Sequence, residues 1–281
     1  MMLAMSNIAW SPDERIGAYA ILAEAGFTGL EIAPGLFFHA AADPFLPDEQ
    51  TARDALDEAR DAGLSLVSMQ SLLFGVTGAG LFEGADARAA FEAGMIRAIT
   101  LAGRFGVPNL VFGSPTQRRV PEGMAMEAAL GQAADVFRRL GDAAAAAGTR
   151  IAIEPNPAAY GTNFLNTLDA ADGFAQAVCH PAIALILDLG AMHMNGEFAS
   201  VPARLPALTA RLNHVHVSEP DLAPAPAEAA SLVPVLKGLR HAGYANAVSI
   251  EMKRPAGGLD DVRQAAARLA AAHRSVEAVH A

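Results

Sequence analysis

Residues 183–189 read IALILDL, an apolar run in which the only charged residue is Asp188. Seven similar short runs occur along the chain, and longer Ala-rich stretches with charges at helical spacing separate them. The eight runs lie at about residues 3–10, 28–33, 64–71, 108–114, 150–155, 183–189, 212–218 and 246–252. Alternating strands and helices predict a parallel sheet, and eight such units suit a closed (β/α)8 barrel of about 250 residues. We therefore predict an α/β fold, a single-domain TIM barrel over residues 1–281.

Local signals mark several of the intervening helices. Residues 11–14 (SPDE) form a capping box with proline at the first helical position, and Gly26 ends that helix. Further helices are expected from Pro47 to Gly63 and over 85–105, 121–147 and 259–277. The alternative fold, an open doubly wound sheet, would need a glycine fingerprint after the first strand. Residues 10–12 (WSP) stand there instead, which favours the closed barrel.

Composition excludes several classes of protein. Hydrophobic residues make up 52% of the chain, too many for a disordered protein. Thirty acidic residues against 20 basic ones give a net charge of -10, which argues against a nucleic-acid partner. No apolar run approaches the roughly 20 residues that span a bilayer, and the first residues do not resemble a signal peptide. With a lone Cys179, the sequence predicts a cytoplasmic protein with no membrane partner.

Polar residues gather where the predicted strands end, which is where α/β barrels carry their chemistry. Each of the last four strands has an ionisable residue inside or just after an apolar run, and buried charges are rare unless paired or bound to metal. Neighbouring strands lie about 4.8 Å apart, so these side chains can converge. Three carboxylates and one imidazole would repel one another without a cation between them. We therefore predict one divalent metal ion held by Glu154, Asp188, His216 and Glu251.

The donor set also restricts the metal. It is rich in oxygen, so Mn²⁺, our first choice, or Mg²⁺ suits it better than a thiolate-loving ion, although Co²⁺ or Zn²⁺ also fits. His214 and His216 lie two residues apart and face the same side of a strand. His216 is nearer the carboxyl end and is the predicted ligand. His214 is predicted to be a packed residue or a donor behind the ligands.

Four motifs in the second half of the chain point to a family. EPNP (154–157), LDLGAMHMNGE (187–197), HVHVSE (214–219) and SIEMK (249–253) resemble the xylose-isomerase-like TIM barrel superfamily, in particular its ketose 3-epimerase and sugar-phosphate-isomerase branch. The resemblance implies that Glu154 and Glu251 both bind the metal and move protons. It also implies that His193 helps to hold the substrate. Glu219 resembles a carboxylate that follows the metal histidine by three residues.

The chain departs from the epimerase pattern at substrate positions. Asp188 and His193 are five residues apart where the epimerases have three, and the loop 220–228 (PDLAPAPAE) lacks their arginine. The stretch 157–164 (PAAYGTNF) also lacks an expected glutamate. Endonuclease IV resembles the same fold but needs three zinc ions and extra histidines on strands two and three. Those strands offer Glu31 and Gln70 instead.

The resemblance implies a sugar or sugar phosphate isomerase or epimerase. Glu154 and Glu251 would act as an acid/base pair that abstracts a proton next to a carbonyl and forms a metal-stabilised enediolate. A metal-dependent dehydratase of a keto-inositol or similar ring begins with the same step, and a non-catalytic sugar-binding barrel is a further alternative. The expected partner is a small-molecule sugar, and a homo-oligomer is expected from the resemblance alone. The predicted substrate-binding residues are His193, Glu219, Lys253, Tyr160 and Gln70.

Some side chains near the strand ends have weaker signals. Asn163, beside Tyr160 in the loop after strand five, could also bind sugar hydroxyls. Lys253 faces the same way as Glu251 and is the best basic candidate for an anionic substrate group. Arg118 and Arg119 are predicted to be ordinary surface charge.

Overall fold

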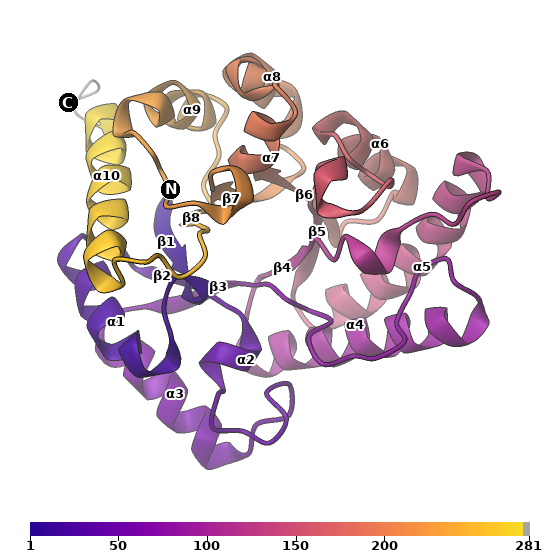
Figure 1. The fold of residues 1–281 in the computed structure, drawn as a ribbon, viewed down its shortest axis with the longest axis horizontal. Helices are drawn as coiled ribbons and strands as arrows, with labels where there is room; N and C mark the ends of the chain where they lie inside the picture. The colour runs from indigo at the N-terminus through magenta and orange to yellow at the C-terminus, as the bar shows by residue number, and fades with distance from the viewer. Residues whose placement is uncertain (278–281) are drawn as a thin grey trace. The chain divides into compact units, whose positions relative to one another are not determined.

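The computed structural model describes residues 1–277 and shows eight strands that alternate with helices (Figure 1). The strands follow one another as neighbours in chain order, and β8 pairs in parallel with β1, so the order is that of a closed parallel barrel. This confirms the predicted fold class. Residues 278–281, the end of the predicted domain, lie outside the described part. The strands are β1 (Met2–Ser6), β2 (Gly29–Ile32), β3 (Ser65–Met69), β4 (Asn109–Phe112), β5 (Arg150–Ile153), β6 (Ile183–Asp188), β7 (Leu212–Val217) and β8 (Ala247–Ile250).

The helices follow the predicted boundaries with one clear exception. The helix expected from residue 121 begins at Met126, because Pro121 and Gly123 form a turn in which Gly123 has φ +83° and the Met124 amide donates to the Pro121 carbonyl. The predicted helices 85–105 and 259–277 are confirmed. The helices are α1 (Arg15–Glu24), α2 (Pro34–Phe37), α3 (Glu49–Asp61), α4 (Ala85–Phe105), α5 (Met126–Ala146), α6 (Leu168–Val178), α7 (Leu189–Met194), α8 (Val201–Leu208), α9 (Ala229–His241) and α10 (Leu259–Glu277).

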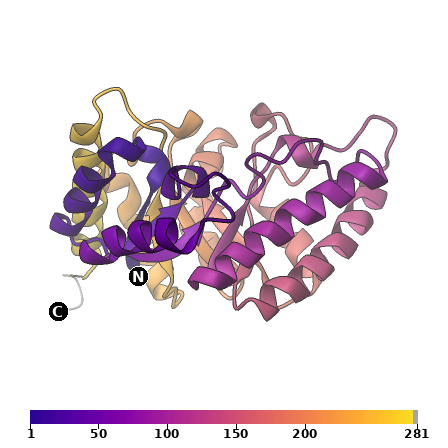
Figure 2. The same ribbon diagram turned by 90° about the horizontal axis from the view of Figure 1, so that it is seen from below.

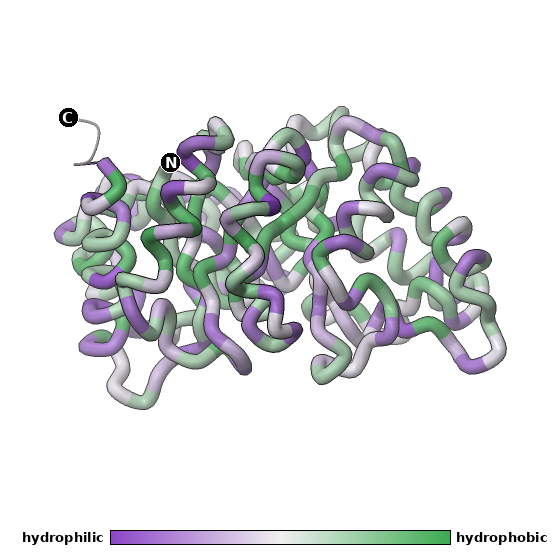
Figure 3. Tube along the Cα trace, turned by 90° about the horizontal axis from the view of Figure 1, so that it is seen from above, coloured by the Kyte–Doolittle hydropathy of each residue, from purple (hydrophilic) through white to green (hydrophobic). Residues whose placement is uncertain are grey.

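The amphipathic pattern of the helices is visible along the trace. In the hydropathy-coloured tube, green and purple segments alternate along the outer helices, as expected when one face of each helix is buried (Figure 3). Among residues 1–277, no helix combines the length and the apolar character that crossing a membrane requires.

Contacts between Cα atoms divide the chain into two compact units. Unit 1 contains residues 1–67 and 188–281, of which 1–67 and 188–277 are described. Its strands pair in the order β7, β8, β1, β2, with His216 opposite Ser249 and Ser6 opposite Glu31. Small residues fill the space between these strands, and a Cβ added to Gly29 would lie only 2.8 Å from that of Ala4. On the outside, α10 packs against both α1 and α9 (Figure 1).

The first strand of unit 1 is shorter than predicted. It ends at Ser6, and residues 7–9 form a 3-10 turn in place of the last predicted strand residues. Asn7 explains the ending, because its side-chain amide binds the backbone of Ala33 on both sides: the Ala33 amide donates to Oδ1 at 2.7 Å and Nδ2 donates to the Ala33 carbonyl at 3.3 Å. These bonds replace further pairing with β2.

Unit 2 contains residues 68–187. Its strands pair in the order β3, β4, β5, β6, with Phe112 opposite Ile153 and Ile153 opposite Leu185. The helices α4 and α5 run alongside each other, and α6 packs on α5 (Figure 2). Aromatic rings fill the layer between strands and helices, with Phe112 and Phe137 centroids 4.9 Å apart and Phe137 and Phe174 centroids 5.4 Å apart. This layer gives β4 and β5 a rigid support.

Candidate metal centre and active site

Three of the four predicted metal ligands come together in unit 1. Asp188 is the last residue of β6, His216 lies on β7, and Glu251 directly follows β8. The Nδ1 atom of His216 lies 3.1 Å from Glu251 Oε2 and 3.5 Å from Asp188 Oδ2. Each residue offers a ligand atom, and these atoms lie within 4.8 Å of one another, so the group could hold a metal ion.

Local structure around α7 determines which oxygen of Asp188 faces His216. Asp188 is the N-cap of α7, and its Oδ1 accepts a hydrogen bond from the Ala191 amide at 2.5 Å. The Gly190 amide donates to Ser218 Oγ at 2.8 Å, which connects the start of α7 to the end of β7. A Cβ on Gly190 would come 2.9 Å from the Glu219 carbonyl, so this close approach requires glycine. Oδ2 of Asp188 is therefore the oxygen presented to His216.

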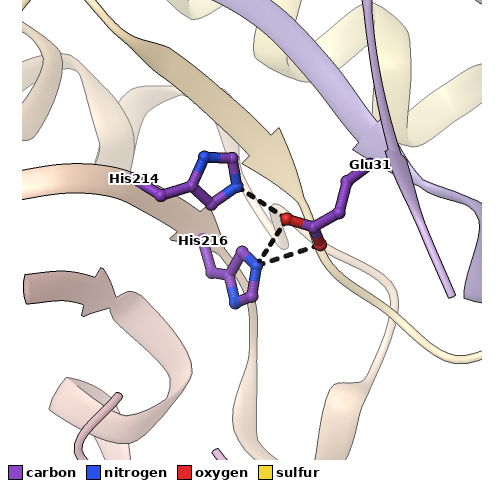
Figure 4. A group of neighbouring side chains, drawn as sticks. All are labelled: Glu31, His214 and His216. Atoms are coloured by element: carbon purple, nitrogen blue, oxygen red, sulfur yellow. Dashed lines mark hydrogen bonds and ion pairs between the residues drawn. The ribbon is translucent and has the colours of Figure 1, made fainter. Parts of the chain in front are cut away.

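A second group of side chains lies behind His216 (Figure 4). Glu31 on β2 is fully buried, and its carboxylate faces two imidazoles. Glu31 Oε2 is 2.7 Å from His214 Nε2, and the two carboxylate oxygens are 3.0 and 3.1 Å from His216 Nε2. Burial raises the pKa of Glu31, but His216 and His214 outweigh burial and hold the pKa below its usual range. Glu31 is therefore an ionised carboxylate that accepts hydrogen bonds.

Two overlapping sets of groups could in principle hold a metal, and their exposure separates them. Glu31, His214 and His216 are 0–1% exposed, and their spacings of 2.7–3.1 Å are those of direct hydrogen bonds. Asp188 and Glu251 retain 8 and 9% exposure, which leaves a route for an ion. The set that contains Asp188, His216 and Glu251, at the carboxyl ends of the strands, is therefore the better candidate for the metal site.

The charges around His216 also favour a cation. Three carboxylates (Glu31, Asp188 and Glu251) surround two imidazoles. If each imidazole carries one proton and is neutral, the group has three negative charges. If both imidazoles are fully protonated, the group still has a net charge of one negative. Uncompensated buried charge is strongly unfavourable. The oxygen and imidazole donors suit Mn²⁺, Mg²⁺, Co²⁺ or Zn²⁺, so the residues fit a divalent ion.

Glu154, the fourth predicted ligand, lies in unit 2 directly after β5. It is 8% exposed, and its Oε2 accepts a hydrogen bond from Asn156 Nδ2 at 2.9 Å. A Cβ added to Gly113, after β4, would collide with Glu154 Oε2, so only glycine leaves room for the carboxylate. Asn156 and Gly113 thus hold Glu154 in one position. The place of Glu154 in the ligand set stays a prediction.

Arg118 corrects one prediction from the sequence. It was expected at the surface, but its side chain is fully buried in unit 2, whereas its neighbour Arg119 is exposed. The guanidinium lies over the Phe112 ring, 5.6 Å from the centroid, and Nη2 donates to the backbone carbonyl of Glu154 at 2.9 Å. Burial lowers the pKa of Arg118 to about 10, and Glu154 partly opposes this effect. Arg118 therefore fixes the backbone at Glu154.

Arg118→Ala is expected to lower the free energy of unfolding by about 2–5 kcal/mol, because the truncation leaves a cavity and removes the donor to the Glu154 carbonyl. Arg118→Met fills most of the volume and removes a desolvated charge, so we expect a loss below about 1.5 kcal/mol. Unfolding in guanidinium chloride measures both. Arg119→Ala, the exposed control, should stay within about 0.5 kcal/mol of the parent. Equal values for Arg118→Ala and Arg119→Ala would contradict this role.

The predicted substrate-binding residues have varied surroundings. His193 is exposed on α7 and stacks on Phe198, with ring centroids 3.8 Å apart. Glu219 is half-buried and accepts a hydrogen bond from the Ala227 amide at 2.8 Å. Lys253 is exposed, and its backbone amide donates to the Leu222 carbonyl. Their substrate contacts stay predictions.

The remaining candidates lie in unit 2. Gln70 is buried just after β3, and Tyr160 is half-buried in a 3-10 turn after β5. Asn163, in contrast, uses its side-chain amide structurally: the Val120 amide donates to Oδ1 at 2.8 Å, and Nδ2 donates to the Val120 carbonyl at 3.0 Å. These two bonds connect the loops after β4 and β5, so Asn163 has a role in loop structure, and its contact with a sugar stays a prediction.

Sequence reasoning did not assign roles to Glu31 or Asn156, and it placed Arg118 at the surface. Glu31 stands in GLEIAP (29–34) in the same pattern as the predicted ligands, a polar residue at the end of an apolar run. That pattern was the available signal. The two histidines that contact Glu31 lie more than 180 residues away in the chain, so only the fold could identify them.

Comparison with known proteins identifies the family. The model of the family described as "Xylose isomerase-like TIM barrel" matches residues 19–272. No curated protein matches the chain. Among solved structures, the D-psicose 3-epimerase of Clostridium cellulolyticum H10 is 17% identical with a TM-score of 0.74, and the alignment covers 98% of this chain and 99% of that chain. An L-ribulose 3-epimerase is 18% identical with a TM-score of 0.74 and coverage of 100% and 99%.

A 3-keto-D-glucoside 4-epimerase from E. coli is also similar, at 18% identity with a TM-score of 0.72 and coverage of 98% and 99%. At these identities the likeness establishes the fold, which this chain shares with sugar epimerases. The family match extends over most of the chain and agrees with the strand order described above. The protein therefore belongs to the xylose isomerase-like TIM barrel family.

Proposed function

We propose that the protein is a metal-dependent isomerase or epimerase of sugars or sugar phosphates. The observation that carries the proposal is the environment of His216, whose Nε2 faces the ionised Glu31 while Nδ1 faces both Asp188 and Glu251. An imidazole that donates from Nε2 and has no second proton presents a lone pair at Nδ1. A lone pair facing two carboxylates is repulsive unless a cation lies among them.

Glu154 is proposed as the fourth ligand. It directly follows β5, and Asp188 is the last residue of β6, the strand that pairs in parallel with β5. Chain order and burial therefore support a ligand set of Glu154, Asp188, His216 and Glu251, with Mn²⁺ as the first choice of metal.

The proposed chemistry is proton transfer next to a carbonyl. A divalent cation bound at this site would supply Lewis-acid stabilisation of the negative charge that develops when the proton leaves. Of the two glutamates, one removes the proton and the other returns a proton to the opposite face, which inverts the carbon. Return to the neighbouring carbon gives an aldose–ketose isomerisation. Asn156 and Gly113 keep the Glu154 carboxylate in place for this transfer.

The similar structures support a sugar substrate. The three reported above are named as epimerases of psicose, ribulose and a keto-glucoside, and each shares the fold over nearly its whole length. We propose His193, Glu219, Lys253, Tyr160 and Gln70 as the residues that contact the sugar. All five lie in or beside the segments that follow β3, β5, β6, β7 and β8.

Solvent exchange tests the proposal and separates its rivals. The purified protein, loaded with Mn²⁺, is incubated in D₂O with free and phosphorylated ketoses and with keto-inositols. Deuterium incorporation without loss of water is the expected result. An ultraviolet-absorbing enone would instead identify a dehydratase. Stoichiometric metal without exchange on any of these compounds would identify a non-catalytic sugar-binding barrel.

Asn156→Ala is expected to slow deuterium exchange about 10- to 100-fold, because a hydrogen bond to a charged group contributes about 1.5–3 kcal/mol and 1.4 kcal/mol corresponds to one factor of ten. Exchange rates and metal content are measured together. Gln176→Ala is the matched control, because it removes a surface amide that donates to Asp172 at 2.7 Å in the same unit. An unchanged rate in Asn156→Ala would refute its role in holding Glu154.

A further inference from the structure

The geometry points to Glu31 as the positioning residue of the metal centre: we propose that its carboxylate fixes the ring and the tautomer of His216, so that Nδ1 is the atom presented to the cation. The inference rests on the proposed function, because it concerns the same metal site. Glu31 does not touch the metal or the substrate in this account. It acts through His216.

The position of Glu31 in the strands supports the first step. It lies on β2 opposite Ser6 of β1, and it is completely buried. A buried carboxylate is rare unless it is paired. Here both oxygens are used, with Nε2 of His216 at 3.0 and 3.1 Å and Nε2 of His214 at 2.7 Å. Figure 4 shows the carboxylate facing both rings.

The donor and acceptor inventory supports the second step. The carboxylate oxygens of Glu31 face Nε2 of His216 at 3.0 and 3.1 Å and Nε2 of His214 at 2.7 Å, and a carboxylate oxygen accepts, so this geometry sets the Nε2 atoms as the donors. In a neutral imidazole, a proton on Nε2 leaves Nδ1 with a lone pair. Nδ1 of His216 then faces Glu251 Oε2 at 3.1 Å and Asp188 Oδ2 at 3.5 Å. Glu31 therefore determines which ring nitrogen is available to a cation.

His214 completes the arrangement. Its ring stands nearly perpendicular to that of His216, at 86° with centroids 5.2 Å apart. His214 Nε2 lies 2.7 Å from Glu31 Oε2, so the carboxylate contacts both imidazoles. A buried carboxylate in close contact with two imidazoles forms a support behind a ligand. Such supports commonly affect metal affinity by 10–100-fold.

Cobalt binding tests the inference without relying on activity. Co²⁺ is titrated into the metal-free protein, and the visible absorption of the ion and the heat of binding give the Kd. Glu31→Gln is expected to raise the Kd about 10–100-fold. Glutamine has the same size, but its NH₂ group faces one of the imidazoles and forces that ring to accept. Glu31→Asp keeps the charge with a shorter reach and should recover part of the affinity.

Two further variants separate the possible outcomes. Asp188→Asn alters a proposed ligand, and Glu58→Gln removes a carboxylate paired with Arg15 at 2.6 Å, away from the metal centre. Glu58→Gln should bind like the parent. If the parent itself binds no Co²⁺, the proposed metal site fails. If the parent binds Co²⁺ and Asp188→Asn does not, while a folded Glu31→Gln binds as tightly as the parent, the metal site stands and the role of Glu31 is overturned.

A measurement on the unaltered protein covers the case in which Glu31→Gln does not fold. Nitrogen-15 NMR of the histidine rings in the Zn²⁺-loaded protein reports which nitrogen carries the proton. We expect protons on Nε2 of both His214 and His216 and none on Nδ1 of His216. A proton on Nδ1 of His216, or an unprotonated Nε2 on His214 or His216, would overturn the inference whether or not Glu31→Gln folds.

Discussion

Glu154→Gln and Glu251→Gln are each expected to lower the rate of deuterium exchange into a ketose by about 10²–10⁴-fold, the range for loss of a general acid or base. Glutamine keeps the size of the side chain but cannot accept a proton at the carboxylate oxygen. Glu251 Oε2 lies 3.1 Å from His216 Nδ1, so this substitution also weakens the ligand set. Exchange measured at saturating Mn²⁺ separates loss of proton transfer from loss of metal.

Glu92→Gln is the control for these two variants. Glu92 is a carboxylate on α4 that pairs with Arg139 at 2.7 Å on the surface of unit 2, and its loss should leave the exchange rate unchanged. If either glutamine variant exchanges as fast as the parent when it holds a full equivalent of metal, that glutamate is not part of the acid/base pair.

Removal of the metal with a chelator is expected to abolish exchange and to lower the stability of the folded protein. A ligand present at 100 times its Kd stabilises the folded state by about 2.7 kcal/mol, so the midpoint of unfolding in urea should fall when the metal is removed. Addition of Mn²⁺ should restore both properties. Mg²⁺, Co²⁺ and Zn²⁺ are tested in parallel, because the donor set admits each of them.

Asp188→Asn gives the matched control for this second prediction. The side-chain oxygen of the introduced asparagine can still accept from the Ala191 amide and cap α7, so the fold is expected to survive. The unfolding midpoint of this variant should no longer respond to Mn²⁺. A response of the same size in Asp188→Asn as in the parent would place the metal elsewhere in the protein.

Much of the fold could be predicted from the sequence because the signals are local. The apolar run at 183–189 and the helical pattern at 85–105 correspond closely to β6 and α4. The two boundary errors have different causes, one tertiary and one local. β1 ends early because Asn7 binds the backbone of Ala33, a partner that local sequence does not reveal. α5 begins late because of the turn at Gly123.

The residues of the candidate site also fall into those that the sequence could predict and those that it could not. Asp188 and His216 could be identified because a charged or polar residue interrupts or ends an apolar strand. Arg118 could not, because nothing in its neighbourhood signals that its side chain turns inward over Phe112. The role of Glu31 depends on pairing with residues of a distant strand. Strand-end position therefore identifies candidate ligands, whereas the residues that support them require the three-dimensional structure.

The central claim is that Glu154, Asp188, His216 and Glu251 hold one divalent ion. A crystal grown with Mn²⁺ and measured at the manganese absorption edge tests it most directly. The account predicts one anomalous peak per chain, bonded to a carboxylate oxygen of each acidic residue and to Nδ1 of His216, with Nε2 of His216 still on Glu31. A peak bonded to Nε2 of His214 and His216, a peak at other residues, or no peak at saturating Mn²⁺ would contradict it.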